Sequence, residues 1–173
     1  MEGVTVVAVA RRAGLNRSTA YQHFPKREDL LTAVAAEFVE AARRIFAAPR
    51  AFSEQIDFFV DYFFEHPDIA RIWIFRLLTG HAESSPGWTD YVTAVERFAR
   101  NPKTREGIDA EMLGVIGLGS ALFWSLIARG RDRSERDARE ATDRFARELK
   151  RLTLFGVLHP ESWPEMVAEL AEK

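Results

Sequence analysis

The stretch from residue 8 to residue 31, AVARRAGLNRSTAYQHFPKREDLL, constrains the fold of this chain more than any other. Apolar residues in and just before its first part recur at helical spacing, which predicts a short helix with one apolar face. Gly14 then ends that helix, because glycine readily adopts the left-handed conformation that a tight turn needs. The apolar residues of this first helix are Val6, Val9, Ala10 and Ala13.

A second short helix is predicted directly after the turn. Asn16 is a good N-cap for it, since its side chain can accept a hydrogen bond from a free backbone N–H. Ala20 and Phe24 lie four residues apart, on the face that we expect to meet the core. Pro25 closes the unit. Two helices joined by a turn of about three residues make a helix-turn-helix.

The opposite face of the second helix carries side chains suited to DNA. Arg can bind guanine and Gln can bind adenine through two hydrogen bonds each, while Ser and Thr can contact base or phosphate. Phosphate contacts position the helix without reading sequence. The predicted base-reading residues are Arg17, Ser18, Thr19 and Gln22, and the predicted phosphate-binding residues are Tyr21, His23, Lys26 and Arg27. The pattern alone leaves open an ordinary αα-corner whose polar face is only solvated.

These residues resemble the DNA-binding signature of the tetracycline-repressor (TetR) family of bacterial transcriptional regulators. The resemblance covers roughly the first 35 residues, and beyond them only the helical layout is similar. It implies a regulator with a DNA-binding head, a helical body that binds a small effector, and a dimer. The matching residues are Gly3, Thr5, Val9-Ala10, Ala13-Gly14, Tyr21, His23-Phe24, Pro25 and Leu30-Leu31.

Two features depart from the family pattern. The Ser that often caps the next helix is missing, although Lys26 and Arg27 keep the positive charge there. The family also begins with a full amphipathic helix, whereas only Met1 and Glu2 precede Gly3 here. Either the chain starts late or the head is clipped, and the sequence leaves both open.

The charge of the chain is unevenly distributed. The net charge is −2, but up to Arg27 there are five basic residues against Glu2 alone, a balance of +4 that leaves −6 on the remainder. A basic head on an acidic body is typical of phosphate binding confined to one end. DNA is therefore the expected macromolecular partner.

The composition indicates a soluble globular protein. Hydrophobic residues make up 47% and charged residues 29% of the 173 residues. Cysteine is absent, which excludes disulfides and thiolate metal sites. We expect no membrane span, because no apolar run approaches roughly 18 residues. The start lacks the features of a signal peptide, so a cytoplasmic location is predicted.

Helical periodicity continues to the end, and no segment alternates as a strand does. The predicted fold is therefore all-α, with about nine helices. We divide the chain into residues 1–47, the head with a connecting helix, and residues 48–173, an effector-binding and dimerisation domain. After the head, helices are expected at residues 28–47, 53–65, 67–78, 89–100, 109–129, 134–156 and 160–173, with Ser53 capping the second of these.

The helix over residues 109–129 has three glycines in its middle. Each costs about 1 kcal/mol relative to alanine, so close approach by another helix or a ligand is expected there. The family resemblance implies that the last two long helices pair with their copies in a second subunit. The predicted homodimer interface is Gly117, Ser120, Trp124, Ala138, Ala141, Phe145 and Leu149.

The body is rich in large aromatic side chains. Individually these fit a core, but collectively they fit a cavity between helices, and the resemblance implies a small-molecule effector. The predicted effector is mainly apolar or aromatic. The predicted ligand-binding residues are Phe59, Tyr62, Phe63, Trp73, Tyr91, Phe123 and Trp124.

The sequence thus predicts a DNA-binding transcriptional regulator, a repressor released from its operator by a small apolar effector. The alternative is a helical small-molecule-binding or scaffold dimer whose short head does not bind DNA. An enzyme ranks third, because no catalytic motif is present. No cofactor or metal is expected, since the four histidines are scattered.

Overall fold

A computed structural model describes residues 5–47, 52–85, 87–128 and 134–172. Within these ranges the chain is all-α, as predicted, with nine α-helices, one short 3-10 helix and no strand. An isolated bridge pairs Thr104 with Leu158. Gly3, one of the residues that carry the family resemblance, lies outside the described residues.

The helices follow one another with short connections. They are α1 (Val6–Arg12), α2 (Arg17–His23), α3 (Arg27–Ala47), α4 (Phe52–Glu65), α5 (Pro67–Leu78), α6 (Trp88–Ala99), α7 (Ala110–Ala128), α8 (Glu135–Gly156), η1 (Pro160–Ser162) and α9 (Pro164–Ala171). The prediction that Ser53 caps α4 is wrong, because α4 already begins at Phe52 and the Ser53 side chain is buried in its first turn.

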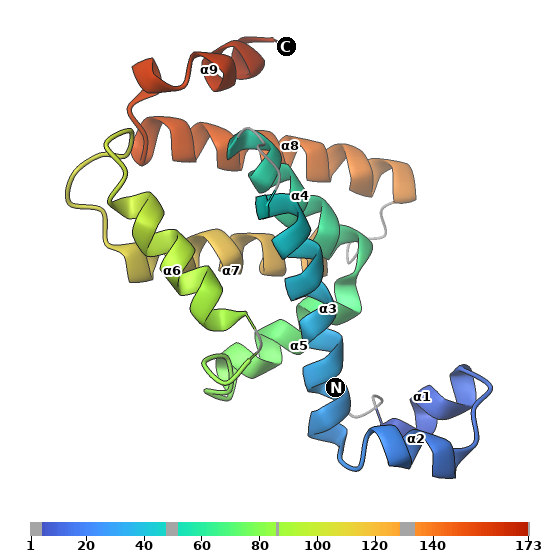
Figure 1. The fold of residues 1–173 in the computed structure, drawn as a ribbon. Helices are drawn as coiled ribbons and strands as arrows, with labels where there is room; N and C mark the ends of the chain where they lie inside the picture. The colour runs from blue at the N-terminus through green and yellow to red at the C-terminus, as the bar shows by residue number, and fades with distance from the viewer. Residues whose placement is uncertain (1–4, 48–51, 86, 129–133, 173) are drawn as a thin grey trace.

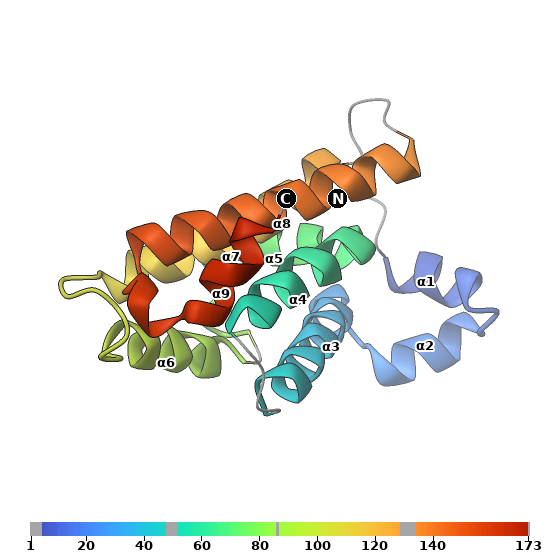
Figure 2. The ribbon, with the colours of Figure 1, turned by 90° about the horizontal axis from the view of Figure 1, so that it is seen from above.

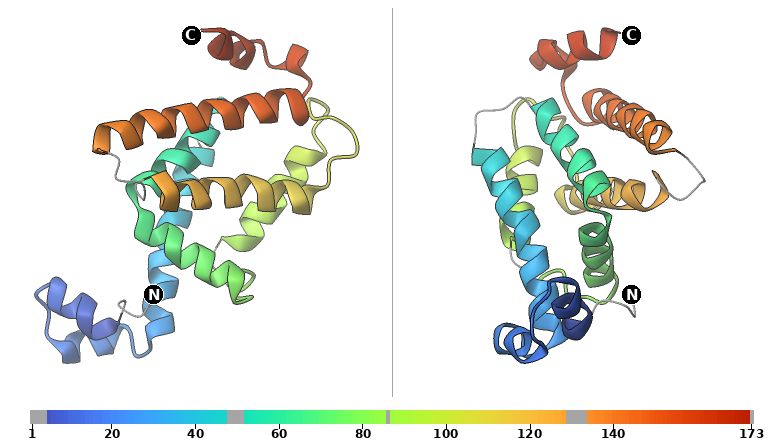
Figure 3. Two further views of the ribbon diagram at one scale, coloured as in Figure 1. Left: turned by 180° about the vertical axis from the view of Figure 1, so that it is seen from behind. Right: turned by 90° about the vertical axis from the view of Figure 1, so that its right-hand side faces the viewer.

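The molecule has a small head and a larger body. In Figure 1 the head, α1 and α2, lies at the lower right, and α3 rises from it into the body. Helices α7 and α8 run along each other, and α9 lies beyond α8 (Figures 1 and 2). Figure 3 shows from behind that the head is far from α8 and α9. Helix α3 is therefore the element that joins the head to the body.

The turn chemistry of the head follows the sequence. The Thr5 hydroxyl accepts a hydrogen bond from the Ala8 N–H at 3.1 Å, and Asn16 Oδ1 accepts one from the Ser18 N–H at 2.9 Å. Both side chains thus cap the helices that follow them. Gly14 has φ +68°, the left-handed conformation predicted for the turn.

A small apolar core holds the head together and ties it to α3. Its buried members come from all three helices and are Val6, Ala10, Ala20 and Leu30, with Phe24 and Val34 packed against them. Two residues assigned to the apolar face of α1 differ from the prediction. Val9 is 39% exposed and Ala13 is also exposed, because the seven-residue helix turns only its Val6–Ala10 edge toward the core.

The start of α3 is capped in a way that the sequence analysis missed. The Asp29 carboxylate reaches back and accepts a hydrogen bond from the Lys26 N–H at 2.9 Å. A carboxylate in the first turn also interacts favourably with the positive end of the helix dipole. Asp29 therefore supplies a cap where the family places Ser.

Helix α7 occupies the centre of the body, where it packs against α4, α5, α6 and α8. The main core contains Val60, Phe63, Trp73 and Leu122, each at most 3% exposed. On α3, the ring of Phe38 contacts five aromatic rings of α4 and α5, at centroid distances of 4.6 to 6.4 Å. Phe38 thus anchors the connecting helix in the body.

The expectation about apolar runs is wrong for α7. This helix of 19 residues is long and apolar enough to cross a membrane by length and composition, which is weak evidence because core helices pass the same test. Only 28% of its apolar stretch is buried within the chain. Helix α7 therefore has an apolar face that the described part of the chain does not cover.

The glycines of α7 differ in their surroundings. The Tyr91 hydroxyl donates a hydrogen bond of 2.6 Å to the Gly114 carbonyl, and a Cβ on Gly114 would lie 3.6 Å from the Tyr91 ring. Burial raises the pKa of Tyr91, so this hydroxyl remains a donor. The predicted close approach of a helix is thus found at Gly114, where α6 meets α7. A Cβ on Gly119, in contrast, would meet no atom within 4 Å.

The C-terminal helix is fastened to the body by a buried lysine. Lys150 on α8 donates to Asp57 on α4 at 2.6 Å and to Glu169 on α9 at 2.5 Å. Burial alone would lower the pKa of Lys150, but its hydrogen bonds to the two carboxylates outweigh burial and raise that pKa. Three helices are thereby joined at one ammonium group.

We expect Lys150→Ala to loosen α9 and to lower the free energy of unfolding by about 2 kcal/mol, because it leaves the Asp57 and Glu169 carboxylates facing each other without a cation. Urea unfolding and hydrogen exchange of α9 amides measure this. The control is Arg151→Ala, which removes an exposed cation 3.8 Å from Glu148 and should cost under about 0.5 kcal/mol. Unchanged exchange in α9 would contradict the role given to Lys150.

Candidate nucleic-acid interface and effector cleft

The outward face of α2 is open to solvent. Ala20 is the buried residue of this helix and fixes which side faces the head core. Seven of the eight residues predicted to contact DNA are exposed: Arg17, Ser18, Thr19, Tyr21, Gln22, His23 and Lys26. Six of these accessible side chains therefore lie on α2, and Lys26 follows shortly after its end.

Arg17 and Tyr21 are arranged as a pair on this face. The guanidinium carbon of Arg17 lies 5.4 Å from the centroid of the Tyr21 ring, one helical turn further along. A cation above an aromatic face is attracted by about 0.5–1 kcal/mol at an exposed site. The interaction limits the freedom of the Arg17 side chain before any ligand is bound.

Arg27 differs from the other seven residues. It is half-buried, and its guanidinium lies 5.9 Å from the ring centroid of Phe75 on α5. This predicted phosphate contact is therefore located at the junction of head and body.

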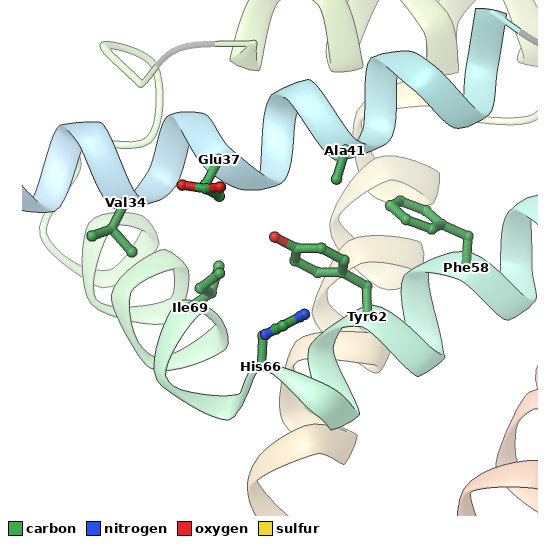
Figure 4. Close-up of a pocket in the computed structure, with 7 residues that line it drawn as sticks. All are labelled: Val34, Glu37, Ala41, Phe58, Tyr62, His66 and Ile69. Atoms are coloured by element: carbon green, nitrogen blue, oxygen red, sulfur yellow. The ribbon is translucent and has the colours of Figure 1, made fainter.

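The body contains an open cleft of about 590 Å³ between α3, α4 and the start of α5. Figure 4 shows its lining, in which Glu37, Tyr62 and His66 present polar atoms to the same space. Pockets that hold small organic ligands typically measure about 300–1,000 Å³. The lining residues are Val34, Glu37, Ala41, Phe58, Tyr62, His66 and Ile69.

The predicted ligand-binding residues are not gathered in this cleft. Tyr62 lines it, whereas Phe63 and Trp73 are buried in the core and Tyr91 contacts α7. Trp124 stacks on Phe145 at 4.6 Å, and Phe123 is 65% exposed on the outer face of α7. Phe59 packs against the core beside Phe38. Helical spacing indicates which apolar residues share a face of a helix, but it does not indicate which of them border a cleft.

Trp73 has an unusual environment for a buried indole. Its side chain is 2% exposed, and its Nε1–H has no hydrogen-bond partner in the described part of the chain. A buried donor without an acceptor costs about 1–3 kcal/mol.

The residues predicted for the dimer interface are divided between the interior and the surface. Ala138 and Ala141 are 1% and 4% exposed, because α8 turns this face toward the rest of the subunit, and they have no surface left for a partner. Trp124 and Phe145 cover each other inside the chain. The remaining three, Gly117, Ser120 and Leu149, are half-buried.

The sequence that forms α1 and α2 is similar to that of a known protein family. Residues 1–34 match the family model described as bacterial regulatory proteins, tetR family. The head is a TetR-family helix-turn-helix. The TetR family consists of DNA-binding transcription regulators, not enzymes. No curated protein and no solved structure matches the chain.

Behind the TetR-family head, a buried arginine connects α3 to the body. Arg76, in the last turn of α5, is 8% exposed. Its Nε–H donates to the Ser85 hydroxyl at 2.6 Å, and its Nη1 donates to the Thr32 hydroxyl on α3 at 3.4 Å. The C-terminal end of α5 also favours a positive charge there. Arg76 thus links α3, α5 and the loop that leads to α6.

A second contact lies further along α3. Gly87, at the start of α6, has φ +76°, and a Cβ there would come within 2.5 Å of Val39. The absence of a side chain at Gly87 is therefore required for α6 to meet α3. An exposed ion pair at 2.9 Å, between Arg43 and Asp90, lies beside it.

Sequence reasoning missed several residues of this junction: Thr32, Val39, Arg76, Ser85 and Gly87. In the sequence, Arg76 is one of many charged residues in amphipathic helices, and only its burial in the structure distinguishes it from an exposed arginine. The cleft residues Glu37 and His66 were missed for a related reason, because residues apart in sequence form the cleft. Gly87 next to Pro86 was the available signal, since a glycine at a helix start often marks a special backbone conformation.

Proposed function

We propose that this chain is a cytoplasmic, dimeric transcription repressor that a small, mainly apolar effector releases from its operator. Residues 1–47 form the DNA-binding head with its connecting helix, and residues 48–173 form the effector-binding and dimerisation domain. The observation that carries the proposal is the solvent-open α2 face of a TetR-family head, with Arg17, Gln22 and Lys26 exposed on or beside it.

The two kinds of side chain on this face have different tasks. Arg17 and Gln22 are suited to base edges in the major groove, where a good bidentate contact contributes about 1–3 kcal/mol of discrimination. Lys26 and His23 are suited to phosphates, which set the position of the helix. Binding should therefore be selective for sequence and should weaken steeply as salt displaces the phosphate contacts.

The partner that we propose for α7 is a second copy of the chain. Large apolar residues form an uncovered stripe along α7, and two more are exposed on the C-terminal half of α8, the helix that packs against it. Gly119, where an added Cβ would meet no atom within 4 Å, lies in this stripe and would let another helix approach closely. A dimer would also present two heads to two half-sites. The stripe consists of Met112, Val115, Ile116, Phe123, Ile127, Leu152 and Phe155.

The effector would act on the body and be sensed by α3. The cleft between α3, α4 and α5 is large enough for a small organic molecule, and α3 contributes one wall of it. A ligand shifts a conformational equilibrium only by its difference in affinity for the two forms. Binding of the effector to the form whose heads no longer match the operator would release the DNA.

The test is a salt titration of binding to the DNA upstream of the chain's own coding region, beside random DNA of equal length. We expect selective binding, with a log–log salt slope of several units. Absence of selectivity there, and in a wider screen of DNA sequences, would contradict the proposal and favour a scaffold or small-molecule-binding dimer.

Single substitutions on α2 sharpen the test. We expect Arg17→Ala to weaken operator binding by about 1–3 kcal/mol and to relax the preference at one base pair. Lys26→Ala should weaken binding to all sequences and reduce the salt slope by about 1. The control is Arg136→Ala on α8, an exposed arginine paired with Glu140 and remote from the head. Equal losses for Arg17→Ala and Arg136→Ala would argue against base reading by α2.

A further inference from the structure

The cleft between α3, α4 and α5 has a specific chemical character. Two aromatic rings, Phe58 and Tyr62, form its floor from α4, with centroids 5.5 Å apart. The His66 ring lies against Tyr62 at 4.6 Å, and Ile69 on α5 contributes an aliphatic wall. In Figure 4 the Glu37 carboxylate points from α3 into the space between these groups. The cleft is thus aromatic on one side and carries a carboxylate on the other.

Glu37 is the acidic member of the described lining, which includes no Lys or Arg. It also makes no ion pair with any described residue. Its neighbour on the same helix behaves differently, since Glu40 forms an ion pair with Arg43 at 2.9 Å. A carboxylate that faces aromatic rings and has no cation of its own favours a positively charged ligand, because opposite charge and π faces both attract cations.

We propose that this cleft binds a small organic cation with an aromatic or bulky apolar body. The ammonium group would lie between the Glu37 carboxylate and the Tyr62 ring, and the apolar body against Phe58 and Ile69. This inference rests on the proposed function, because it names the chemical class of the proposed effector. It replaces a mainly apolar effector with an apolar molecule that carries one positive charge.

The position of the cleft connects binding to the head. Val34 lines the cleft and also packs against the core of the head, beside Leu30. Glu37 and Ala41 continue the same wall along α3, and Phe38 between them is buried among the rings of α4 and α5. A cation in the cleft would therefore contact the helix that carries the reading head, one turn from its core.

The test is isothermal titration of the full chain, without DNA, with three probes that share one ring system. These are the cation (1-naphthylmethyl)trimethylammonium, the neutral 1-naphthalenemethanol and the anion 1-naphthaleneacetate. We expect the cation to bind at least about fivefold more tightly than the neutral probe, with the anion weakest. Added salt should weaken binding of the cation more than binding of the neutral probe.

Two variants assign the effect to the cleft. Glu37→Gln keeps the size of the side chain but removes the charge, and it should weaken cation binding by about fivefold while leaving the neutral probe unchanged. Glu40→Gln, one turn away and outside the cleft lining, is the matched control and should leave both probes unchanged. Equal binding of the three probes, no binding of the cation, or an unaffected Glu37→Gln would overturn the proposal.

The outcome is separable from that of the proposed function. If the chain binds the cation in a Glu37-dependent way but selects no DNA sequence, the cation-binding cleft is supported and the proposed regulator function is contradicted. If the chain binds DNA selectively but does not bind the cation, the regulator function is supported and the cation-binding cleft is contradicted.

Discussion

If the chain forms the proposed dimer, the double substitution Ile116→Glu and Phe123→Glu is expected to convert it into monomers and to lower its affinity for the proposed operator by about 100-fold or more. Both residues lie on the uncovered stripe of α7, with 62% and 65% of their surface exposed in the single chain. In a dimer they would be buried, and four carboxylates would then be taken from water into an apolar contact. Each separated head would bind one half-site alone.

Sedimentation equilibrium and operator titration of the same samples measure the two effects. The control is Leu78→Glu, which places a carboxylate at an 81% exposed apolar residue at the end of α5, outside the stripe. It should leave both the mass and the operator affinity unchanged. A wild-type chain that is already monomeric, or a double variant that remains dimeric, would contradict the proposed dimer contact through the stripe.

The second large effect is expected at Phe38. Phe38→Ala should lower the free energy of unfolding by about 3–5 kcal/mol, the usual cost of removing a buried phenylalanine. The ring is 6% exposed and contacts Phe58, Phe59, Tyr62, Phe63 and Trp73, so no single neighbour can fill the space it leaves. Because it anchors α3, its loss should also loosen the head relative to the body.

Urea unfolding at one fixed protein concentration measures this loss, and Leu78→Ala is the control. Leu78 is 81% exposed, so its truncation should cost less than about 0.5 kcal/mol. If Phe38→Ala cost no more than the control, the cluster around Phe38 would not be the anchor of α3.

The head could be predicted from the sequence because its determinants are local. The caps at Thr5 and Asn16, the turn at Gly14 and the inward Ala20 are each set by a few neighbouring residues. Local rules also explain the cap at α3 that was missed, since Asp29 acts from three residues away. The all-α class followed from periodicity in the same way.

The candidate ligand and dimer surfaces of the body could not be predicted, because they depend on which helices meet. Phe123 and Trp124 are adjacent in sequence and equally aromatic, yet one is exposed and the other stacks on Phe145. Ala138 and Ala141 have the small, regularly spaced character of an interface, but the subunit itself covers them. The cleft required Glu37 and Tyr62 to face each other across two helices, which spacing within either helix does not reveal.

The continuous α3 has a mechanical consequence. From Glu37 to the first residue of the helix, Arg27, the distance along the axis is about 15 Å at 1.5 Å per residue. A tilt of about 10° at the cleft would therefore sweep the near end of the head through about 2.5 Å, whereas good N–H···O hydrogen bonds tolerate a spread of only about 0.5 Å. If the proposed effector tilts this helix by about 10°, the displacement of the head would therefore exceed what hydrogen bonds to base edges tolerate.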